Sequence, residues 1–389
     1  MKSPRLNLLL TLPNSALMAV LAVLQSRWLG VEDRGLVVLI LTVSGSSAVI
    51  GSLGYGLARV GDDFGKLNFK DIQLRVFVSI ALALVIFIAV ALFHGIELDV
   101  WIFGFLLISG LSYSCLFIFT DLLLTSHLSL RVRGIALFSI LLEVFLNVLL
   151  HNSSQLTLHK VFLVNSIIAF FGILTILYLI KDYGDFHGGE GRLNFKDLPY
   201  LVVYMSSFLY IYVYRLPASY VVNPSDLALL SISFSFAFVG TPLIYFVMHY
   251  TRTLINDRQV IERKLLKIVS ATFLILTLLA TIEFLFAKEL ILYTVGDDFF
   301  GSIELLQRIA FMVPFFALFM IYLSARQGQT KTSQIKASGG YLIGNVFLIL
   351  FFGATYGVAG ICTSILILHL ILGTFGGWRL FRMSLRQRI

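Results

Sequence analysis

A few charged side chains stand inside long apolar runs of this sequence, and these positions offer the chemistry. Arg27, Arg215 and Arg308 each lie near one end of an apolar run. A guanidinium presents a planar fork of donors that can bind a phosphate or a carboxylate through two hydrogen bonds. The three arginines are therefore candidates for binding an anion between helices. If the runs cross a membrane, snorkelling of each side chain to the membrane surface is the alternative explanation.

Two acids lie in similar surroundings. Glu143 stands near the middle of its apolar run, at the deepest ionisable position of the chain, and Glu283 lies close to the end of another run. A carboxylate inside an apolar span can carry a proton or pair with a cation. Both are candidates for coupling to a proton or sodium gradient. The alternative for Glu143 is a neutral acid that is hydrogen-bonded to a neighbouring helix.

Three prolines also fall within apolar runs. Pro13, Pro242 and Pro314 can each open the local backbone and bend a helix. Such bends would suit a rocking motion between two halves of a protein, so these prolines are hinge candidates. Proline is also common in membrane helices that have no gating role.

The elements that must position these residues follow from composition. Of the 389 residues, 58% are hydrophobic and only 13% are charged, whereas soluble proteins carry about 25% charged residues. About 20 apolar residues span a bilayer as a helix. The sequence therefore predicts an all-α integral membrane protein with about twelve transmembrane helices. The runs lie near residues 7–26, 36–58, 76–95, 101–125, 134–150, 161–180, 198–219, 227–248, 266–287, 305–324, 338–355 and 358–378.

The basic residues predict the orientation. With a cytoplasmic N-terminus, most of the 29 Lys and Arg residues fall in alternate, cytoplasmic loops, as the positive-inside rule requires. This asymmetry favours an even number of spans and a cytoplasmic C-terminus. Because the basic residues are dispersed over many short loops, the net charge of +8 does not indicate a nucleic-acid partner.

Soluble catalytic machinery is not indicated. The sequence has no phosphate-binding P-loop motif, and its histidines show no metal-ligand spacing. Cys115 and Cys362 both lie in apolar runs, which favours packing roles over a disulfide or a metal site. The loops are too short for a catalytic domain. We therefore expect a protein that is not an enzyme, has no metal or cofactor, and works between its helices.

The stretch RWLGVEDRG at 27–35 breaks the first two runs. We expect it to form the outer turn of a helical hairpin, with Glu32, Asp33 and Arg34 solvated and without substrate contact. A similar helix, break and helix surrounds VNPSDLALL, and aligning Gly30 with Asn223 pairs the two hairpins.

Spans four and five and spans ten and eleven form a second pair. Six spans separate the two repeats, so both have the same orientation. This predicts two six-helix lobes, at 1–184 and 185–389, with a cytoplasmic linker at 181–197.

Several motifs resemble one transporter family. RWLGVEDRG is similar to the R-x-L-G-P-E-x-x-G hairpin of polysaccharide-exporting members of the multidrug/oligosaccharidyl-lipid/polysaccharide (MOP) exporter superfamily, the branch that contains the O-antigen flippases. FAKELILYTVGDDFFGSIELLQRIAFMVPFFAL resembles the segment around its ninth and tenth helices, and GNVFLILFFGATYGVAGICTSILI resembles its last two helices. The sequence departs from the family at Val31, where proline is frequent, and at Asn223 and Ala228, where glycines are frequent.

The resemblance implies a flippase with two six-helix lobes in a V-shaped arrangement. Such a protein moves undecaprenyl-diphosphate-linked oligosaccharide across the bacterial inner membrane by alternating access, for the synthesis of O-antigen, capsule or exopolysaccharide. The implied partners are this substrate, membrane lipids and other polysaccharide-assembly proteins. Arg308, Arg215 and Arg27 would then meet the diphosphate.

Two alternatives stay open. A multidrug or small-cation antiporter of the same fold would place acids in its cavity, and Glu143 is compatible with that function. A membrane-embedded transferase or polymerase of polysaccharide assembly is a third candidate. It would need long outer loops with convergent carboxylates or histidines, which this sequence does not show.

Overall fold

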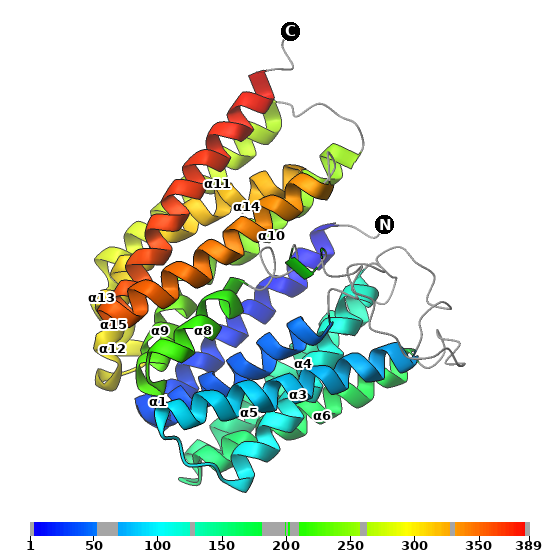
Figure 1. Ribbon diagram of the computed structural model, residues 1–389, viewed down its shortest axis with the longest axis vertical. Coiled ribbons are helices and arrows are strands. Elements are labelled where there is room, and N and C mark those ends of the chain that lie inside the picture. Colours follow the sequence, from blue (N-terminus) through cyan, green and yellow to red (C-terminus); the bar gives the residue numbers. More distant parts are fainter. Residues whose placement is uncertain are drawn as a thin grey trace. The chain divides into compact units, whose positions relative to one another are not determined.

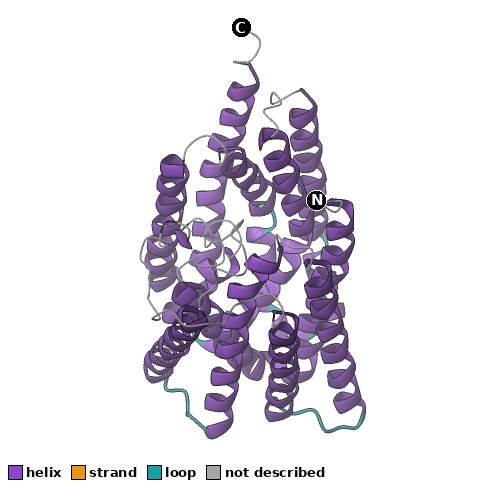
Figure 2. Ribbon diagram, turned by 90° about the vertical axis from the view of Figure 1, so that its right-hand side faces the viewer, coloured by secondary structure: helices purple, strands orange, loops and turns teal. Residues whose placement is uncertain are grey.

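The computed structural model is built of helices, and every regular element among its described residues is helical (Figure 2). It describes residues 4–52, 69–124, 129–180, 199, 201–202, 210–256, 263–326 and 331–385. The chain divides into two compact units, Met1–Ser225 and Asp226–Ile389. The linker predicted at 181–197 and the loops at 125–128 and 327–330 lie outside the described residues.

The longest helices, α1 (Pro4–Ser52) and α15 (Lys331–Leu385), are each a pair of helices joined at a glycine. Gly30 has φ 74° and ψ 178°, and Gly357 has φ 62° and ψ −149°. These are conformations that glycine adopts without a steric cost. The first and last predicted hairpins therefore turn where the sequence places Gly30 and Gly357, and each long helix supplies two of the predicted spans.

The described part of unit 1 contains α1 and five further helices: α3 (Phe69–His94), α4 (Val100–Leu124), α5 (Ser129–Asn152), α6 (Leu158–Ile180) and α8 (Tyr210–Val221). α1 packs against α3, α4, α5 and α8, and α6 packs against α4 and α5 (Figure 1). Among the described residues, the second half of α1 is a deeply buried segment of this bundle, so it packs in the interior of the unit.

Unit 2 is centred on α14 (Met312–Arg326), which packs against α15, α10 and α11. Its other elements are α9 (Pro224–Ala237, entering from the end of unit 1), η3 (Phe238–Gly240), α10 (Thr241–Asn256), α11 (Arg263–Leu285), α12 (Ala287–Thr294), η4 (Asp297–Phe299) and α13 (Gly301–Ile309). α13 and α14 together form one candidate span with a bend of 42°.

Large apolar side chains remain exposed along the outer helices, among them Phe77, Leu92, Phe138 and Leu274. Side chains of this kind suit contact with lipid. Seven described helices are long and apolar enough to cross a membrane, or eight with the bent pair. Once the two glycine-kinked helices are counted as pairs and shorter segments are included, the helices correspond to the predicted spans. The predicted fold, an all-α multi-pass membrane protein, is confirmed.

Candidate functional site

A buried polar cluster lies just inside the first hairpin of unit 1. Arg34 Nη1 donates a hydrogen bond to Gln25 Oε1 at 2.6 Å, and Gln25 Nε2 donates to Glu143 Oε1 at 3.4 Å. Arg34 is 6% exposed and Gln25 is 2% exposed. Both halves of α1 and the middle of α5 therefore meet through one chain of polar side chains.

The inward position of Arg34 corrects the sequence-based expectation of a solvated loop. The helix resumes directly after Gly30, so Glu32, Asp33 and Arg34 belong to its first turn. Residues two positions apart in a helix point to nearly opposite sides. Glu32 is consequently exposed and Asp33 half-buried, whereas Arg34 turns into the bundle.

The cluster carries unfilled hydrogen-bonding capacity. Among the described residues, neither Arg34 Nε nor the Asn147 Oδ1 atom has a hydrogen-bond partner. Asn147 lies one turn beyond Glu143 on α5 and is fully buried, and its Nδ2 donates to Glu143 O at 2.8 Å. Buried polar atoms without partners are costly. The arrangement can therefore accept a polar ligand that supplies both an anionic oxygen and a donor.

Further ionisable groups act on this site. The charges of Arg215 and Glu143 and the phenol of Tyr113 are close enough to affect Arg34 electrostatically. Arg215 comes from α8 and is half-buried. Two guanidinium groups and one carboxylate therefore share one region of unit 1. An anion would relieve the repulsion between the two arginines.

Close packing fixes the hairpin that carries Arg34. A Cβ atom added at Gly35 would lie 2.2 Å from Pro224 O, so only glycine allows this approach of the two backbones. Trp28 stacks on His151 with ring centroids 4.5 Å apart, which ties the first half of α1 to the end of α5. These two contacts hold in place the helix segments that carry Arg34 and Glu143, the two hydrogen-bond partners of Gln25.

Two other candidate residues, Arg27 of unit 1 and Glu283 of unit 2, lie outside the buried cluster. Arg27 is exposed on α1 and points away from the buried side of Gln25 and Ser26. Glu283 is half-buried near the end of α11. The structure does not bring Glu283 to any other ionisable group among the described residues of unit 2.

Arg308 belongs to a separate, more open arrangement in unit 2. It pairs with Glu304 on the same helix, α13, with Nη2 and Oε1 2.5 Å apart. Its Nη1 donates to Thr363 Oγ1 on α15 at 3.1 Å. The Arg308 side chain is 40% exposed and that of Glu304 is 68% exposed. Its Nε, Nη1 and Nη2 atoms all have partners, whereas Arg34 Nε has none among the described residues.

Two of the three prolines stand at helix interruptions. Pro242 is buried in the first turn of α10, directly after the 3₁₀ segment Phe238–Gly240. Pro314 is buried in the first turn of α14, at the bend between α13 and α14. Pro13 is exposed within an uninterrupted stretch of α1. The hinge role of all three remains a prediction.

Sequence reasoning selected Glu143 and Arg215 but did not predict that Gln25 and Arg34 lie in the same buried cluster. Gln25 is uncharged and therefore gave no signal within an apolar run. Its contact with Glu143 joins residues 118 positions apart. The inward position of Arg34 could have been predicted from helical periodicity. If a helix starts directly after Gly30, Arg34 points to the side opposite Glu32.

No group of His, Cys, Asp and Glu residues suited to a metal ion occurs in the described part of the chain. Comparison with protein-family models gave no match, and comparison with curated protein sequences also gave none. Solved structures do match.

A structure of the lipid II flippase MurJ in an inward closed conformation aligns with a TM-score of 0.68 and 14% identity, over 97% of this chain and 89% of that one. An inward-facing multidrug resistance MATE family transporter of the MOP superfamily aligns with a TM-score of 0.63 and 14% identity, over 100% and 99% of the two chains. A MOP superfamily transporter from Pyrococcus furiosus, described as having a binding pocket of reverse polarity, aligns with a TM-score of 0.63 and 14% identity, over 99% of this chain and 98% of that one. The buried cluster of unit 1 is therefore set in a chain that has the fold of MOP superfamily transporters.

Proposed function

We propose that this protein is a flippase for lipid-linked oligosaccharide. It moves an undecaprenyl-diphosphate-linked sugar unit from the inner to the outer leaflet of the bacterial inner membrane, for synthesis of a surface polysaccharide. The N- and C-termini are cytoplasmic in this proposal. Membrane lipids and other polysaccharide-assembly proteins are its partners.

The observation that carries the proposal is the buried guanidinium of Arg34. Its Nε atom has no partner among the described residues, and its one hydrogen bond in this cluster goes to an uncharged amide, Gln25. A buried cation with free donors is costly unless an anion meets it. A diphosphate supplies several acceptor oxygens, and Arg215 adds a second positive charge in the same region.

Glu143 supplies a means of releasing the substrate. Its carboxylate is linked to Arg34 through Gln25, so a change in its protonation alters the charge that Arg34 experiences. A proton or sodium gradient could act through this acid. Asn147 Oδ1, unpaired within the described residues, offers an acceptor for a sugar hydroxyl.

Genetic complementation tests the proposal. A bacterial strain that lacks its own oligosaccharide-lipid flippase would receive the wild type, Arg34→Ala or Glu143→Gln at matched membrane abundance. We expect the wild type to restore surface glycan, and Arg34→Ala to lose this ability.

The second candidate is a multidrug or small-cation antiporter, which the acid Glu143 favours. Failure of the wild type to restore several unrelated glycans, together with proton-driven dye export from inverted vesicles, would replace the flippase proposal with this one.

A further inference from the structure

Two arginines and their aromatic neighbours form a cluster near the end of α15, in unit 2. Arg379 Cζ lies 5.1 Å from the ring centroids of both Phe375 and Trp378, and Arg382 Cζ lies 5.4 Å from that of Trp378. These distances are within the range of a cation–π interaction, which extends to about 6 Å. Phe375 in turn packs edge-on against the ring of Tyr322 on α14, so the cluster is fixed to the bundle.

Both guanidinium groups keep donors that no described residue uses. Within the described part of the chain, no hydrogen bond or ion pair reaches Arg379 or Arg382. Stacking on a ring covers the face of a guanidinium, but it leaves the N–H groups at the edge, in the plane of the group. These in-plane donors match the oxygens of a phosphate. The cluster is therefore suited to an anion with several acceptor oxygens.

The cluster lies far from the turn of α15. Arg308 of α13 donates to Thr363, shortly after the turn at Gly357, so α13 lies at the turn end of α15. Figure 1 shows α12 and α13 beside this turn, with the other end of α15 far from them. Thr363 and Arg379 are about 24 Å apart along the helix, at ~1.5 Å per residue.

The described acids of unit 2 lie at the turn end. The sequence has no acidic residue after Glu304, so α14 and α15 contain none. The others stand on α13 or on the elements that adjoin it, including α9, which shares hydrogen bonds with α13. They are Asp226, Glu283, Glu289, Asp297, Asp298 and Glu304. None of these carboxylates can neutralise the arginines at the far end of α15.

The exposed rings indicate what surrounds the cluster. Trp378 is 49%, Phe375 41% and Phe381 55% exposed. α15 is apolar enough to cross a membrane, and tryptophan near the end of such a helix is typical of the level of lipid headgroups. A soluble anion would leave the rings in water. A phospholipid covers them with its acyl chains and meets the guanidinium groups with its phosphate.

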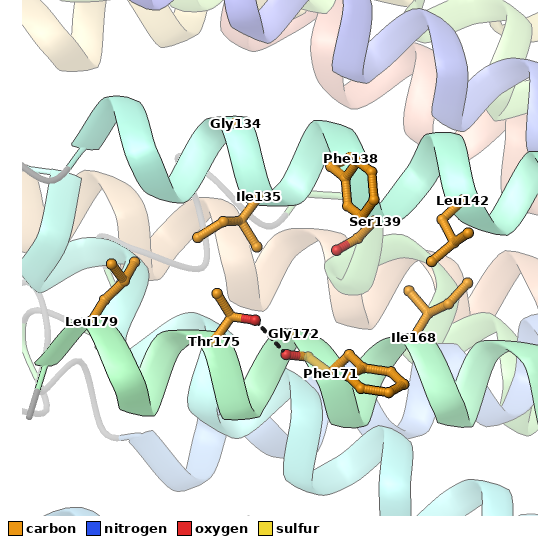
Figure 3. A pocket seen from close by; sticks show the side chains of 10 residues that line it. All are labelled: Gly134, Ile135, Phe138, Ser139, Leu142, Ile168, Phe171, Gly172, Thr175 and Leu179. Carbon is orange, nitrogen blue, oxygen red and sulfur yellow. Dashed lines mark hydrogen bonds between the residues drawn. The ribbon is translucent and has the colours of Figure 1, made fainter.

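The apolar groove between α5 and α6 of unit 1 provides a contrast. Figure 3 shows side chains of both helices projecting into this groove, and none of the residues that line it is charged. The hydroxyl of Thr175 donates to Phe171 O at 2.7 Å. Lipid beside this groove would have apolar contacts without a cationic partner for its phosphate. Exposed rings and free guanidinium donors occur together at the end of α15.

We propose that the cluster of Arg379, Arg382 and Trp378 binds the headgroup phosphate of an anionic phospholipid such as phosphatidylglycerol. An anionic headgroup has no ammonium group to oppose the two arginines. This inference goes beyond the proposed function and does not depend on which substrate is transported. The bound lipid holds the end of α15 at a fixed level in the membrane, and it holds α14 there through Phe375 and Tyr322.

Tryptophan fluorescence tests the site. With Trp28→Phe and Trp101→Phe, Trp378 is the single tryptophan of the full chain. This protein would be reconstituted in phosphatidylcholine vesicles that contain equal fractions of either phosphatidylglycerol or phosphatidylcholine with brominated acyl chains, which quench a ring that they contact. We expect phosphatidylglycerol to bind beside Trp378 about 25-fold more tightly than phosphatidylcholine, about fivefold for each arginine.

Charge removal supplies the second arm. Arg379→Gln and Arg382→Gln should each lower the preference about fivefold, and the double variant should abolish it. Arg382 is exposed, so its variant gives the result if Arg379→Gln fails to fold. Lys336→Gln is the matched control, since Lys336 is an exposed basic residue near the start of α15, at the same end of the bundle. It should change the preference less than about twofold, because salt screens charges that do not touch the headgroup.

A tryptophan in the α5–α6 groove supplies the control position. Phe171 is 59% exposed in this groove. In the same background with Trp378→Phe, the new tryptophan of Phe171→Trp should be quenched equally by the two brominated lipids.

Three results would overturn the site. They are equal quenching of Trp378 by the two lipids, an equal loss of preference in Lys336→Gln and Arg382→Gln, and the same preference at position 171, which would indicate diffuse surface charge. Undecaprenyl diphosphate is added in a last arm. If it displaced the brominated phosphatidylglycerol completely at a level where unlabelled phosphatidylglycerol displaced only half, the phospholipid would be the wrong occupant and the site would belong to the substrate headgroup.

Discussion

The two units each contain an arginine near a glutamate, but the surroundings of the two pairs differ. In unit 1, Arg34 and Glu143 come from different helices and are linked through Gln25. Arg34 is buried and Glu143 is half-buried. In unit 2, Arg308 and Glu304 lie one turn apart on α13, with side chains 40% and 68% exposed. Residue type alone does not distinguish these arrangements. Burial and the origin of the partners do, and on both criteria the arginine of unit 1 is the one held inside its bundle.

The largest expected effect tests this difference directly. Arg34→Ala should lower the rate of substrate translocation in reconstituted vesicles about ten- to hundredfold, because a hydrogen bond to a charged group contributes about 1.5–3 kcal/mol. Arg27→Ala, which removes an exposed arginine from the same helix, is the control. Equal rates for the two variants at matched abundance would show that the buried position of Arg34 has no role in transport.

Helix packing at the hairpin is the next test. Gly35→Ala should lower the free energy of unfolding by about 1–3 kcal/mol, since the added Cβ overlaps the backbone at Pro224. Gly373→Ala in unit 2 should have a similar effect, because its Cβ would lie 2.4 Å from Phe315 O. Thermal unfolding in detergent, followed by size-exclusion chromatography, measures both.

Gly104→Ala supplies the control for this pair. Its Cβ would meet no atom within 4 Å, so its unfolding temperature should stay close to that of the wild type. A destabilisation by Gly104→Ala as large as that by Gly35→Ala would attribute the effect to glycine replacement in general and not to the close backbone approach.

A third test asks whether Gln25 joins the two charges. In a double-mutant cycle of Gln25→Leu and Glu143→Gln, we expect a coupling energy of about 0.5–3 kcal/mol in translocation or stability, as for residues that share one hydrogen-bond network. Additive effects of the two substitutions would mean that Gln25 contacts Glu143 without energetic consequence. Leu is similar in size to Gln, so Gln25→Leu leaves little empty space and adds little cavity energy to the measured effect.

Much of the fold followed from the sequence because hydrophobic length determines membrane spans directly. The turn near Gly30 follows from local residues, and the break between the apolar runs at 338–355 and 358–378 falls at Gly357. The structure places a glycine with positive φ at each position. The side on which a residue faces is harder to predict within an almost uniformly apolar chain. Arg34 was therefore assigned to the solvated turn, although it lies in the first turn of a helix and points inward.

The candidate site shows the same limit. Glu143 could be selected from its depth in an apolar run, whereas its partner Gln25 depends on the packing of α1 against α5. The sequence indicates Arg215 and Arg308 equally as candidates for binding an anion. In the structure, Arg215 lies near the buried cluster of Arg34, whereas Arg308 pairs with Glu304 on its own helix. Contacts between distant segments decide which charged residues share a site, and these are not visible in single runs.

The smallest expected effect concerns Arg308. Exposed ion pairs one helical turn apart contribute about 0.3–0.5 kcal/mol, so Arg308→Ala and Glu304→Ala should each change stability only slightly, with a coupling energy in the same range. The hydrogen bond from Arg308 to Thr363 adds a link between α13 and α15, so Thr363→Val serves as a second partner variant. The translocation rate of Arg308→Ala should remain within about threefold of the wild-type rate. This is less than the tenfold change that corresponds to about 1.4 kcal/mol. If Arg308→Ala abolished translocation at normal abundance while Arg34→Ala did not, the anion site would belong to the exposed pair of unit 2. Burial would then be the wrong criterion for selecting functional arginines in this fold.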